Sequence, residues 1–125
     1  MKRDMDLLRK ILLAIEEQYK PGEGTIRDLT IEGYDLNTIA EHCYLLHQQG
    51  LITSYKPSQA CDKIVLFFVG NLTSAGYDFL ELVKNEEIWD KTKTEVQKKK
   101  LPETIEEFAR IAGIFIGNIV KGITT

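Results

Sequence analysis

Several features that would mark a specialised protein are scarce or missing in this chain of 125 residues. It has two cysteines, Cys43 and Cys61, and two histidines, His42 and His47. A single pair of cysteines in a chain without a secretory leader favours reduced thiols over a disulfide. Cys43 lies on the predicted buried stripe of a helix, and His42 and His47, five positions apart, point to different sides of that helix, so we expect no metal site and a core role for Cys43. We expect each histidine to flank the core.

Long hydrophobic runs and catalytic motifs are missing as well. No apolar run approaches the roughly 18 residues of a membrane span, and the chain opens directly on an amphipathic segment. There is no glycine-rich phosphate loop and no nucleophile motif. We therefore expect a cytoplasmic protein that does not bind membranes, is not an enzyme and needs no cofactor. A composition of 43% hydrophobic and 28% charged residues is that of an ordinary globular domain.

Two helices are predicted in the first half of the chain by apolar residues spaced three and four apart. The first follows Asp4, a good N-cap, and buries Leu8, Ile11, Leu12 and Ile15. The second runs from Asp35 to Gly50 with Ile39 at the centre of a stripe that includes Leu36, Cys43 and Leu46. We expect the two stripes to pack together. Residues 25–34 between them fit a short strand or a weak helix, and we favour the strand.

A hairpin is predicted between residues 51 and 70. The segment LITSY begins the first strand, KPSQACDK reads as the turn, and IVLFFVG is the second strand. A continuous apolar strand is typical of one that is covered on both faces, so we expect another element to pack over it.

The rest of the chain is predicted to be helical. Thr73 is the expected N-cap of the next helix and Asn85 its end, followed by a polar helix anchored by Trp89. The last helix is apolar over most of its circumference, which predicts burial in the core or against a partner. A homodimer through this helix is one expectation and cover of the apolar strand is the alternative. Small residues in the dimer face would allow close approach: Ala109, Gly113 and Gly117, with Ile116 beside them.

The order of these elements is that of a mainly α (α+β) winged helix-turn-helix, in which the hairpin is the wing. We expect a core of residues 1–84 with a C-terminal helical extension, 85–125, packed on it as one compact domain. The stretches MKRDMDLLRKILLAIEE, IEGYDLNTIAEHCYLLHQQGLI and LTSAGYDFLELVKNEEIWDKTK resemble a bacterial family catalogued as domain of unknown function 2513, often found in prophages. The resemblance implies a winged-helix fold and a phage context, and it supplies no catalytic residues.

DNA binding is the obvious function of such a fold, but the predicted recognition helix contains neither lysine nor arginine. Between Lys20 and Leu51 there are two positive and five negative side chains, and the whole chain has a net charge of −3. Phosphate contacts from Lys and Arg supply most nonspecific DNA affinity. Basic residues occur elsewhere, in the first helix, around the wing and in KTKTEVQKKK. The first helix and the wing could contact a phosphate backbone, but a solvated helix surface is the stronger explanation for KTKTEVQKKK.

Two functions therefore stay open. We favour a DNA-binding regulator that contacts double-stranded DNA. The alternative is a protein-interaction module, an accessory or anti-host factor, that uses the same surface to bind a protein partner without binding DNA. Exposed Tyr44 and Leu45 would anchor the protein partner, because aromatic residues dominate the centres of interfaces. The outward-facing and wing residues that would make the contacts are Asn37, Thr38, Glu41, Tyr44, Leu45, Gln48, Lys56 and Lys63.

Overall fold

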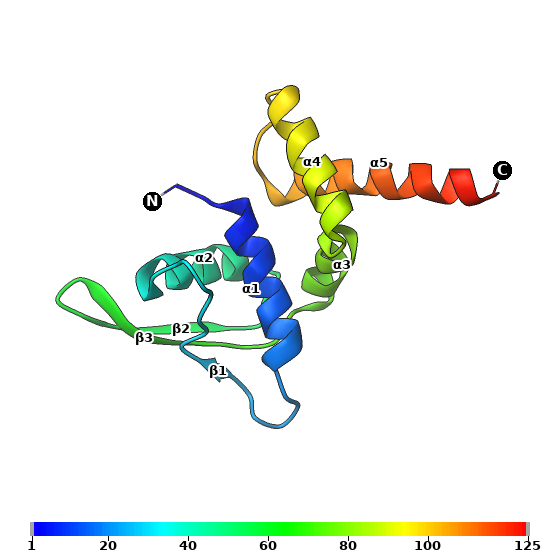
Figure 1. The fold of residues 1–125 in the computed structure, drawn as a ribbon. Coiled ribbons are helices and arrows are strands. Elements are labelled where there is room, and N and C mark those ends of the chain that lie inside the picture. The colour runs from blue at the N-terminus through cyan, green and yellow to red at the C-terminus, as the bar shows by residue number, and fades with distance from the viewer. Residues whose placement is uncertain (1, 125) are drawn as a thin grey trace. The chain divides into compact units, whose positions relative to one another are not determined.

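The computed structural model describes residues 2–124 and is mainly helical, with a small three-stranded antiparallel sheet (Figure 1). The chain forms two compact units, Met1–Tyr77 and Asp78–Thr125, and the division falls within α3. The elements are α1 (Met5–Gln18), β1 (Ile26–Arg27), α2 (Leu36–Gln48), β2 (Tyr55–Ala60), β3 (Lys63–Val69), α3 (Ser74–Val83), α4 (Glu86–Lys98) and α5 (Ile105–Thr124).

The core of the first unit forms where α1 contacts α2, as the apolar spacing predicted. Asp4 is the N-cap of α1, since its side chain accepts a hydrogen bond from the backbone N–H of Leu7. The predicted stripes are buried on both helices, whereas Leu36 is only half-buried. The fully or almost fully buried members are Leu8, Ile11, Leu12 and Ile15 of α1 and Ile39, Cys43 and Leu46 of α2.

His42 is fully buried, which corrects the expectation that it flanks the core. Its Nε2 accepts a hydrogen bond of 2.9 Å from the backbone N–H of Asp4, and its Nδ1 lies 2.8 Å from the carbonyl oxygen of Thr38. Only a neutral ring that carries its proton on Nδ1 satisfies both partners. The imidazole therefore joins the start of α1 to the middle of α2 inside the core.

The segment between β1 and α2 is held by polar contacts rather than by a helix. Asp28, in the left-handed region with φ 47°, donates from its backbone N–H to the Phe67 carbonyl and accepts from the Phe67 N–H through its side chain. Further along, the Tyr34 hydroxyl donates to Asp4 Oδ2 at 2.9 Å, which raises the pKa of Tyr34. The predicted short strand is present as β1, and the segment after it is tied to β3 and to the start of α1.

The strand order is β1–β3–β2, and β2 begins and ends later than predicted. Residues 51–54 contain only an isolated bridge, Ile52 with Leu72, and KPSQA belongs to β2 instead of a turn. The turn consists of Cys61 and Asp62 alone, with φ of 52° and 64°. Positive φ at both positions is the geometry of a type I′ two-residue hairpin turn, which matches the twist of the flanking strands.

Pro57 occupies β2 without breaking a bond to β3. Its partner in the register is Phe67, and the backbone N–H and carbonyl of Phe67 both bond to Asp28 on the β1 side. The pair of Pro57 and Phe67 is therefore a non-hydrogen-bonded pair, in which the backbone of Pro57 faces the open edge of the sheet. A proline is tolerated at such an edge position because no ladder donor is lost.

Only one face of β3 is fully buried, so the prediction of cover on both faces is wrong. The register shifts between Ser58 and Gln59, which leaves Val65 opposite no residue of β2 and 51% exposed. This bulge changes the alternation of buried and exposed side chains along β3. The buried face consists of Ile64, Phe67 and Val69, and the opposite face consists of half-buried Leu66 and Phe68.

The start of α3 packs tightly on the segment before the hairpin. Thr73 is its N-cap, as predicted: its Oγ1 accepts from the Gly76 N–H and donates to the carbonyl of Gly50. A Cβ on Gly76 would collide with the carbonyl oxygen of Leu51, so only glycine fits there.

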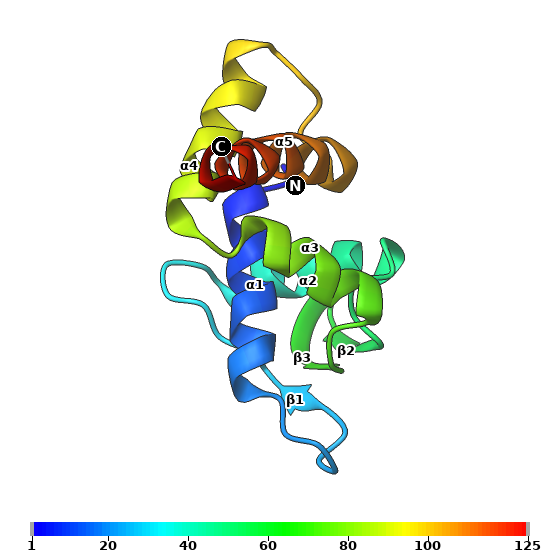
Figure 2. The same cartoon turned by 90° about the vertical axis from the view of Figure 1, so that its right-hand side faces the viewer.

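The second unit contains the contact between α4 and α5. Asn85 begins α4 as its N-cap, accepting from the Ile88 N–H, which corrects its expected place at the end of the preceding helix. Trp89 and Phe108 lie with ring centroids 5.1 Å apart in the core of this unit. Figures 1 and 2 show α4 crossing α5 near its start, so that the second half of α5 continues beyond α4.

The packing of α2 on α1 predicts a large loss of stability for Leu46→Ala. The side chain is completely buried, so we expect the free energy of unfolding to fall by about 2 to 5 kcal/mol in a urea titration. Val65→Ala removes methyl groups from an exposed side chain and is the control, with an expected change below about 0.5 kcal/mol. An equal effect of the two substitutions would mean that α2 presents a different face to α1.

Candidate binding groove between α2 and the hairpin

The outward face of α2 presents the residues expected to contact DNA or a protein partner. Glu41, Tyr44 and Gln48 are exposed there, and Leu45 is half-buried. The Gln48 side-chain amide donates to the Tyr44 hydroxyl at 2.9 Å, so the two side chains support each other one helical turn apart. Tyr44 is 44% exposed, although most of its ring is apolar.

Asn37 and Thr38 lie at the start of α2 and are engaged in holding the fold. The Asn37 side chain bonds to Ile64 twice, accepting from its N–H at 3.0 Å and donating to its carbonyl at 3.4 Å. The Thr38 N–H donates to Asp35, the N-cap, and thereby lowers the pKa of that carboxyl, while the Thr38 carbonyl faces His42. A bidentate base contact from Asn37 would compete with both bonds to Ile64.

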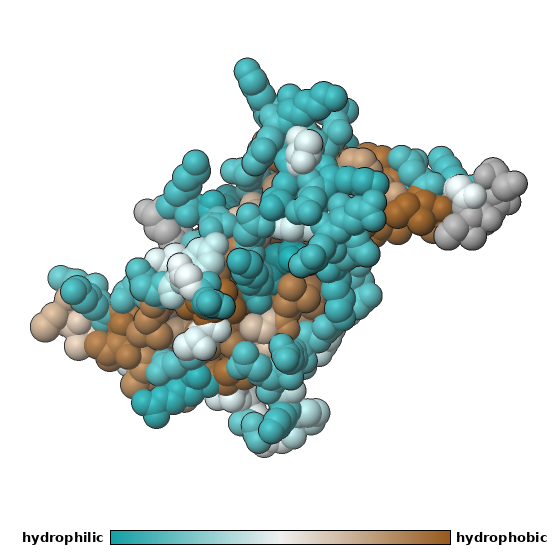
Figure 3. Space-filling model, viewed as in Figure 1, coloured by the Kyte–Doolittle hydropathy of each residue, from teal (hydrophilic) through white to brown (hydrophobic). Residues whose placement is uncertain are grey.

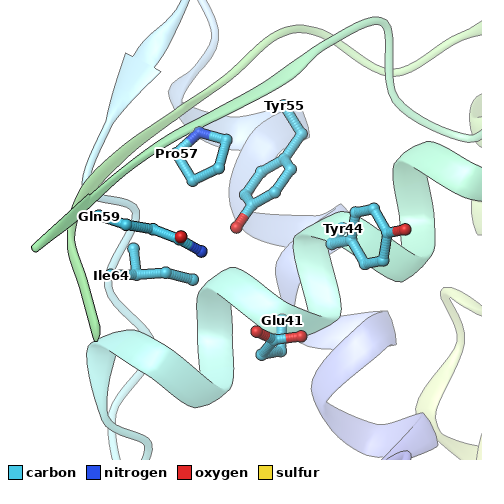
Figure 4. Close-up of a pocket in the computed structure, with 6 residues that line it drawn as sticks. All are labelled: Glu41, Tyr44, Tyr55, Pro57, Gln59 and Ile64. Atoms are coloured by element: carbon cyan, nitrogen blue, oxygen red, sulfur yellow. The ribbon is translucent and has the colours of Figure 1, made fainter. Parts of the chain in front are cut away.

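A pocket of about 210 Å³ separates the outward face of α2 from β2 (Figure 4). Glu41 and Tyr44 of α2 form one side, and Tyr55, Pro57 and Gln59 of β2 form the other, with Ile64 of β3 at the end. Figure 4 shows the Tyr55 hydroxyl and the Gln59 amide pointing toward each other above α2, whereas the Tyr44 hydroxyl points away from the pocket. We call this pocket and the outward face of α2 the α2–β2 groove.

The polar groups of the pocket are available to a ligand. Among the described residues, no hydrogen bond or ion pair involves the side chains of Glu41, Gln59 or Tyr55. Partial burial raises the pKa of Tyr55 to about 12, with smaller contributions from Cys43 and the Glu41 carboxylate. The Tyr55 hydroxyl therefore stays protonated at neutral pH and can donate as well as accept.

Lys56 and Lys63 lie on the opposite face of the hairpin from the pocket. Side chains alternate along a strand, and because Tyr55, Pro57 and Gln59 line the pocket, Lys56 points to the other side. Lys63 pairs with Ala60 and shares that outer face. The structure thus separates the two wing lysines from Glu41 and Tyr44, although the sequence grouped them as one contact set.

The outer face of the sheet contains a third cation. Arg27 of β1 pairs with Phe68, which pairs in turn with Lys56, so these three side chains form a row across the three strands. Arg27 is 66% exposed and its Nε lies 3.6 Å from Asp28 Oδ2, a long contact for an ion pair. This row is the most basic part of the sheet.

The two glycines of the predicted dimer face have open space beside them. Ala109, Gly113, Ile116 and Gly117 are half-buried, and a Cβ built on either glycine would have no heavy atom within 4 Å. Figure 3 shows apolar surface along the second half of α5, where Ile114, Ile119 and Val120 are about half exposed. A homodimer through this helix stays a prediction.

Within residues 2–124 no three His, Cys, Asp or Glu side chains cluster as metal ligands would, and both thiols are free. Of the helices that the structure describes, none has the length and apolar content to cross a membrane.

Comparison with known proteins places the groove within a family. A family model described as "Hypothetical protein (DUF2513)" matches residues 2–102, which include α1 to α4 and every residue of the groove. The chain belongs to this DUF2513 family. It is also 28% identical over 120 residues to an uncharacterized protein of Haemophilus influenzae, across 96% of this chain and 99% of that protein. No solved structure matches the chain.

Sequence reasoning missed Pro57 and Gln59, because the segment after Tyr55 was assigned to a turn. Proline and serine in this segment favoured that assignment. Tyr55 already belongs to the predicted strand, and Cys61 and Asp62 alone are enough for a two-residue turn. These two signals together could have extended the strand to Ala60.

The bonds of Asn37 predict a structural effect for Asn37→Ala. Loss of two hydrogen bonds between α2 and β3 should lower the free energy of unfolding by about 1 to 2 kcal/mol, measured by urea denaturation. Asn118→Ala, at an exposed helical position, is the control and should change stability by less than about 0.5 kcal/mol. If Asn37→Ala left the free energy of unfolding unchanged, the side chain would not be needed for the fold and could serve recognition.

The two cysteines should differ sharply in reactivity. Burial raises the pKa of Cys43 to about 12, which leaves a thiolate fraction of about 10⁻⁴ at pH 8, whereas Cys61 is exposed in the hairpin turn. We expect Ellman's reagent to titrate one thiol per native chain quickly and two in denaturant. In Cys61→Ser the fast reaction should disappear. Fast reaction of both native thiols would contradict the buried position of Cys43.

Proposed function

We propose that this protein is a winged-helix module that binds a protein partner through the α2–β2 groove. The winged-helix assignment is supported by the element order α1, β1, α2, β2, β3 and by a sheet in which β1 pairs beside the hairpin. Residues 28–35 contain no helix, so α2 stands alone where a helix-turn-helix has two helices. The cytoplasmic location and the phage context expected from the sequence stay predictions.

The outward face of α2 is the observation on which the protein-binding function rests. It combines an exposed aromatic residue, Tyr44, with the unpaired carboxylate of Glu41, and it contains no lysine or arginine. In a major groove, Glu41 would lie close to phosphates and reduce affinity. In a protein interface, a central tyrosine can supply a large share of the binding energy.

The open edge of β2 borders this surface. The described residues provide no partner strand on that side, and the backbone of Pro57 faces outward without an N–H. Proline at an edge position discourages pairing with a further strand. We therefore expect the partner to contact side chains of the groove rather than extend the sheet.

A DNA-binding regulator is the second candidate, and the outer sheet face favours it. The row of Arg27, Phe68 and Lys56, with Lys63 nearby, places positive charge on a strand surface that could contact a phosphate backbone. This face lies opposite the pocket, so DNA bound there would not place α2 in the major groove.

Site-specific photo-crosslinking distinguishes the two functions. With a benzophenone amino acid at position 45 or 48, we expect a discrete protein adduct, identified by mass spectrometry, in cells of the native host. The adduct should be lost in Tyr44→Ala, because the central aromatic anchor is removed. Ser58, exposed on the outer face of β2, is the control position and should give no such adduct.

Three results would contradict protein binding by this surface. They are an adduct of equal yield from position 58, an adduct that persists in Tyr44→Ala, and a nucleic-acid adduct from position 45 or 48. A nucleic-acid adduct from position 58 alone would instead support the second candidate. Circular dichroism of the Tyr44→Ala protein, whose side chain is exposed, checks that the fold is intact.

A further inference from the structure

We infer that the pocket between α2 and β2 receives an arginine side chain of the protein partner. This inference rests on the proposed function and specifies the chemistry of the group that enters the groove. Three properties of the pocket support it: an unpaired negative charge, aromatic walls, and free hydrogen-bonding groups that converge on the same space.

The negative charge comes from Glu41. Its side chain is exposed at the edge of the pocket, and no cation pairs with it among the described residues. Lys56, the cation nearest in sequence to the pocket-lining tyrosine of β2, points to the other face of the hairpin. A positive group from outside the chain would therefore complement a charge that the chain itself leaves unbalanced.

The aromatic walls come from both elements. Tyr44 and Tyr55 lie with ring centroids 6.1 Å apart and planes inclined at 50°, and Tyr55 is backed by Phe67 at 6.2 Å. The packing on Phe67 fixes the position of the Tyr55 ring. Tyrosine faces attract cations, and the planar guanidinium group also stacks on them, which an ammonium group cannot do.

The hydrogen-bonding groups match a guanidinium better than an ammonium. A guanidinium has five N–H donors in a fixed plane and accepts none. The pocket offers the Glu41 carboxylate, the Gln59 amide oxygen and the Tyr55 hydroxyl oxygen as acceptors, and Figure 4 shows the Gln59 amide group and the Tyr55 hydroxyl pointing toward the same space. A water molecule takes about 30 Å³ in the liquid, so a pocket of about 210 Å³ has room for a guanidinium.

The test is a titration of the ¹⁵N-labelled full chain with the peptide acetyl-Gly-Arg-Gly-amide, followed by NMR. We expect saturable shifts that centre on Glu41, Tyr44, Tyr55 and Gln59. The same peptide with citrulline has nearly the same shape without the charge, and it should produce no saturable shift. The lysine peptide should bind several-fold more weakly than the arginine peptide, because it lacks the planar fork.

Two matched variants locate the charge. Glu41→Gln should weaken binding of the arginine peptide by about threefold to fivefold, the range expected for a partly exposed ion pair. Glu32→Gln removes the same charge from an exposed turn outside the pocket and should leave the dissociation constant unchanged.

The inference is overturned if the arginine peptide causes no saturable shift, if citrulline or lysine binds equally well, or if Glu32→Gln weakens binding as much as Glu41→Gln. Shifts confined to residues outside the groove would overturn it too. Its failure is distinguishable from failure of the proposed function. A Tyr44-dependent protein adduct from position 45 would still show a protein interface, whose anchor would then be a group other than arginine.

Discussion

The buried imidazole of His42, together with the apolar stripe of Ile39, Cys43 and Leu46, determines which side of α2 faces outward. It bonds to the Asp4 backbone in front of α1 and to the Thr38 carbonyl within α2, and both partners are satisfied only in one orientation of the ring. Rotation of α2 about its axis would break both bonds of the buried imidazole and leave its polar atoms without partners, which is costly. The exposed positions of Glu41 and Tyr44 therefore follow from the contacts of the buried side of the helix.

The hairpin is fixed to α2 by a second polar contact and is shaped by its own irregularities. The bonds of Asn37 to Ile64 hold the start of β3 against the start of α2. The bulge at Val65 then keeps Ile64 and Phe67 on one face, although they are three positions apart in the sequence. Because of this arrangement, alternate residues of β2 line the pocket and the lysines of the wing lie on the far side.

The helices of the first unit could be predicted because their apolar residues repeat with a helical period. Asp4 and Thr73 were predicted as N-caps for the same local reason, since a short polar side chain precedes each repeat. The buried position of His42 could not be predicted in this way. Its partner, Asp4, is 38 residues away in the sequence, and only the tertiary fold brings the two together.

The candidate site was predicted only on its helical side. The outward face of α2 follows from the same periodicity that gives its buried face, so Glu41, Tyr44 and Gln48 were found. The strand side depends on the register of β2 with β3, which is set by the two-residue turn and the bulge. The same register decides on which side of the sheet Lys56 lies. Amino-acid composition does not determine the register.

The central claim is that α2 presents a surface for a protein and not for DNA, and the most direct measurement is a salt-titrated binding assay. The wild-type chain is titrated into a mixed-sequence DNA duplex at about 50 mM salt and binding is followed by fluorescence anisotropy. Electrostatic attraction between protein and DNA is strong at such low salt, so weak binding would be detected. With Glu41 on the outward face and no lysine or arginine in α2, the account predicts no binding at micromolar protein. Binding that weakens steeply with salt and is reduced by substitutions at Gln48 or Leu45 would contradict it.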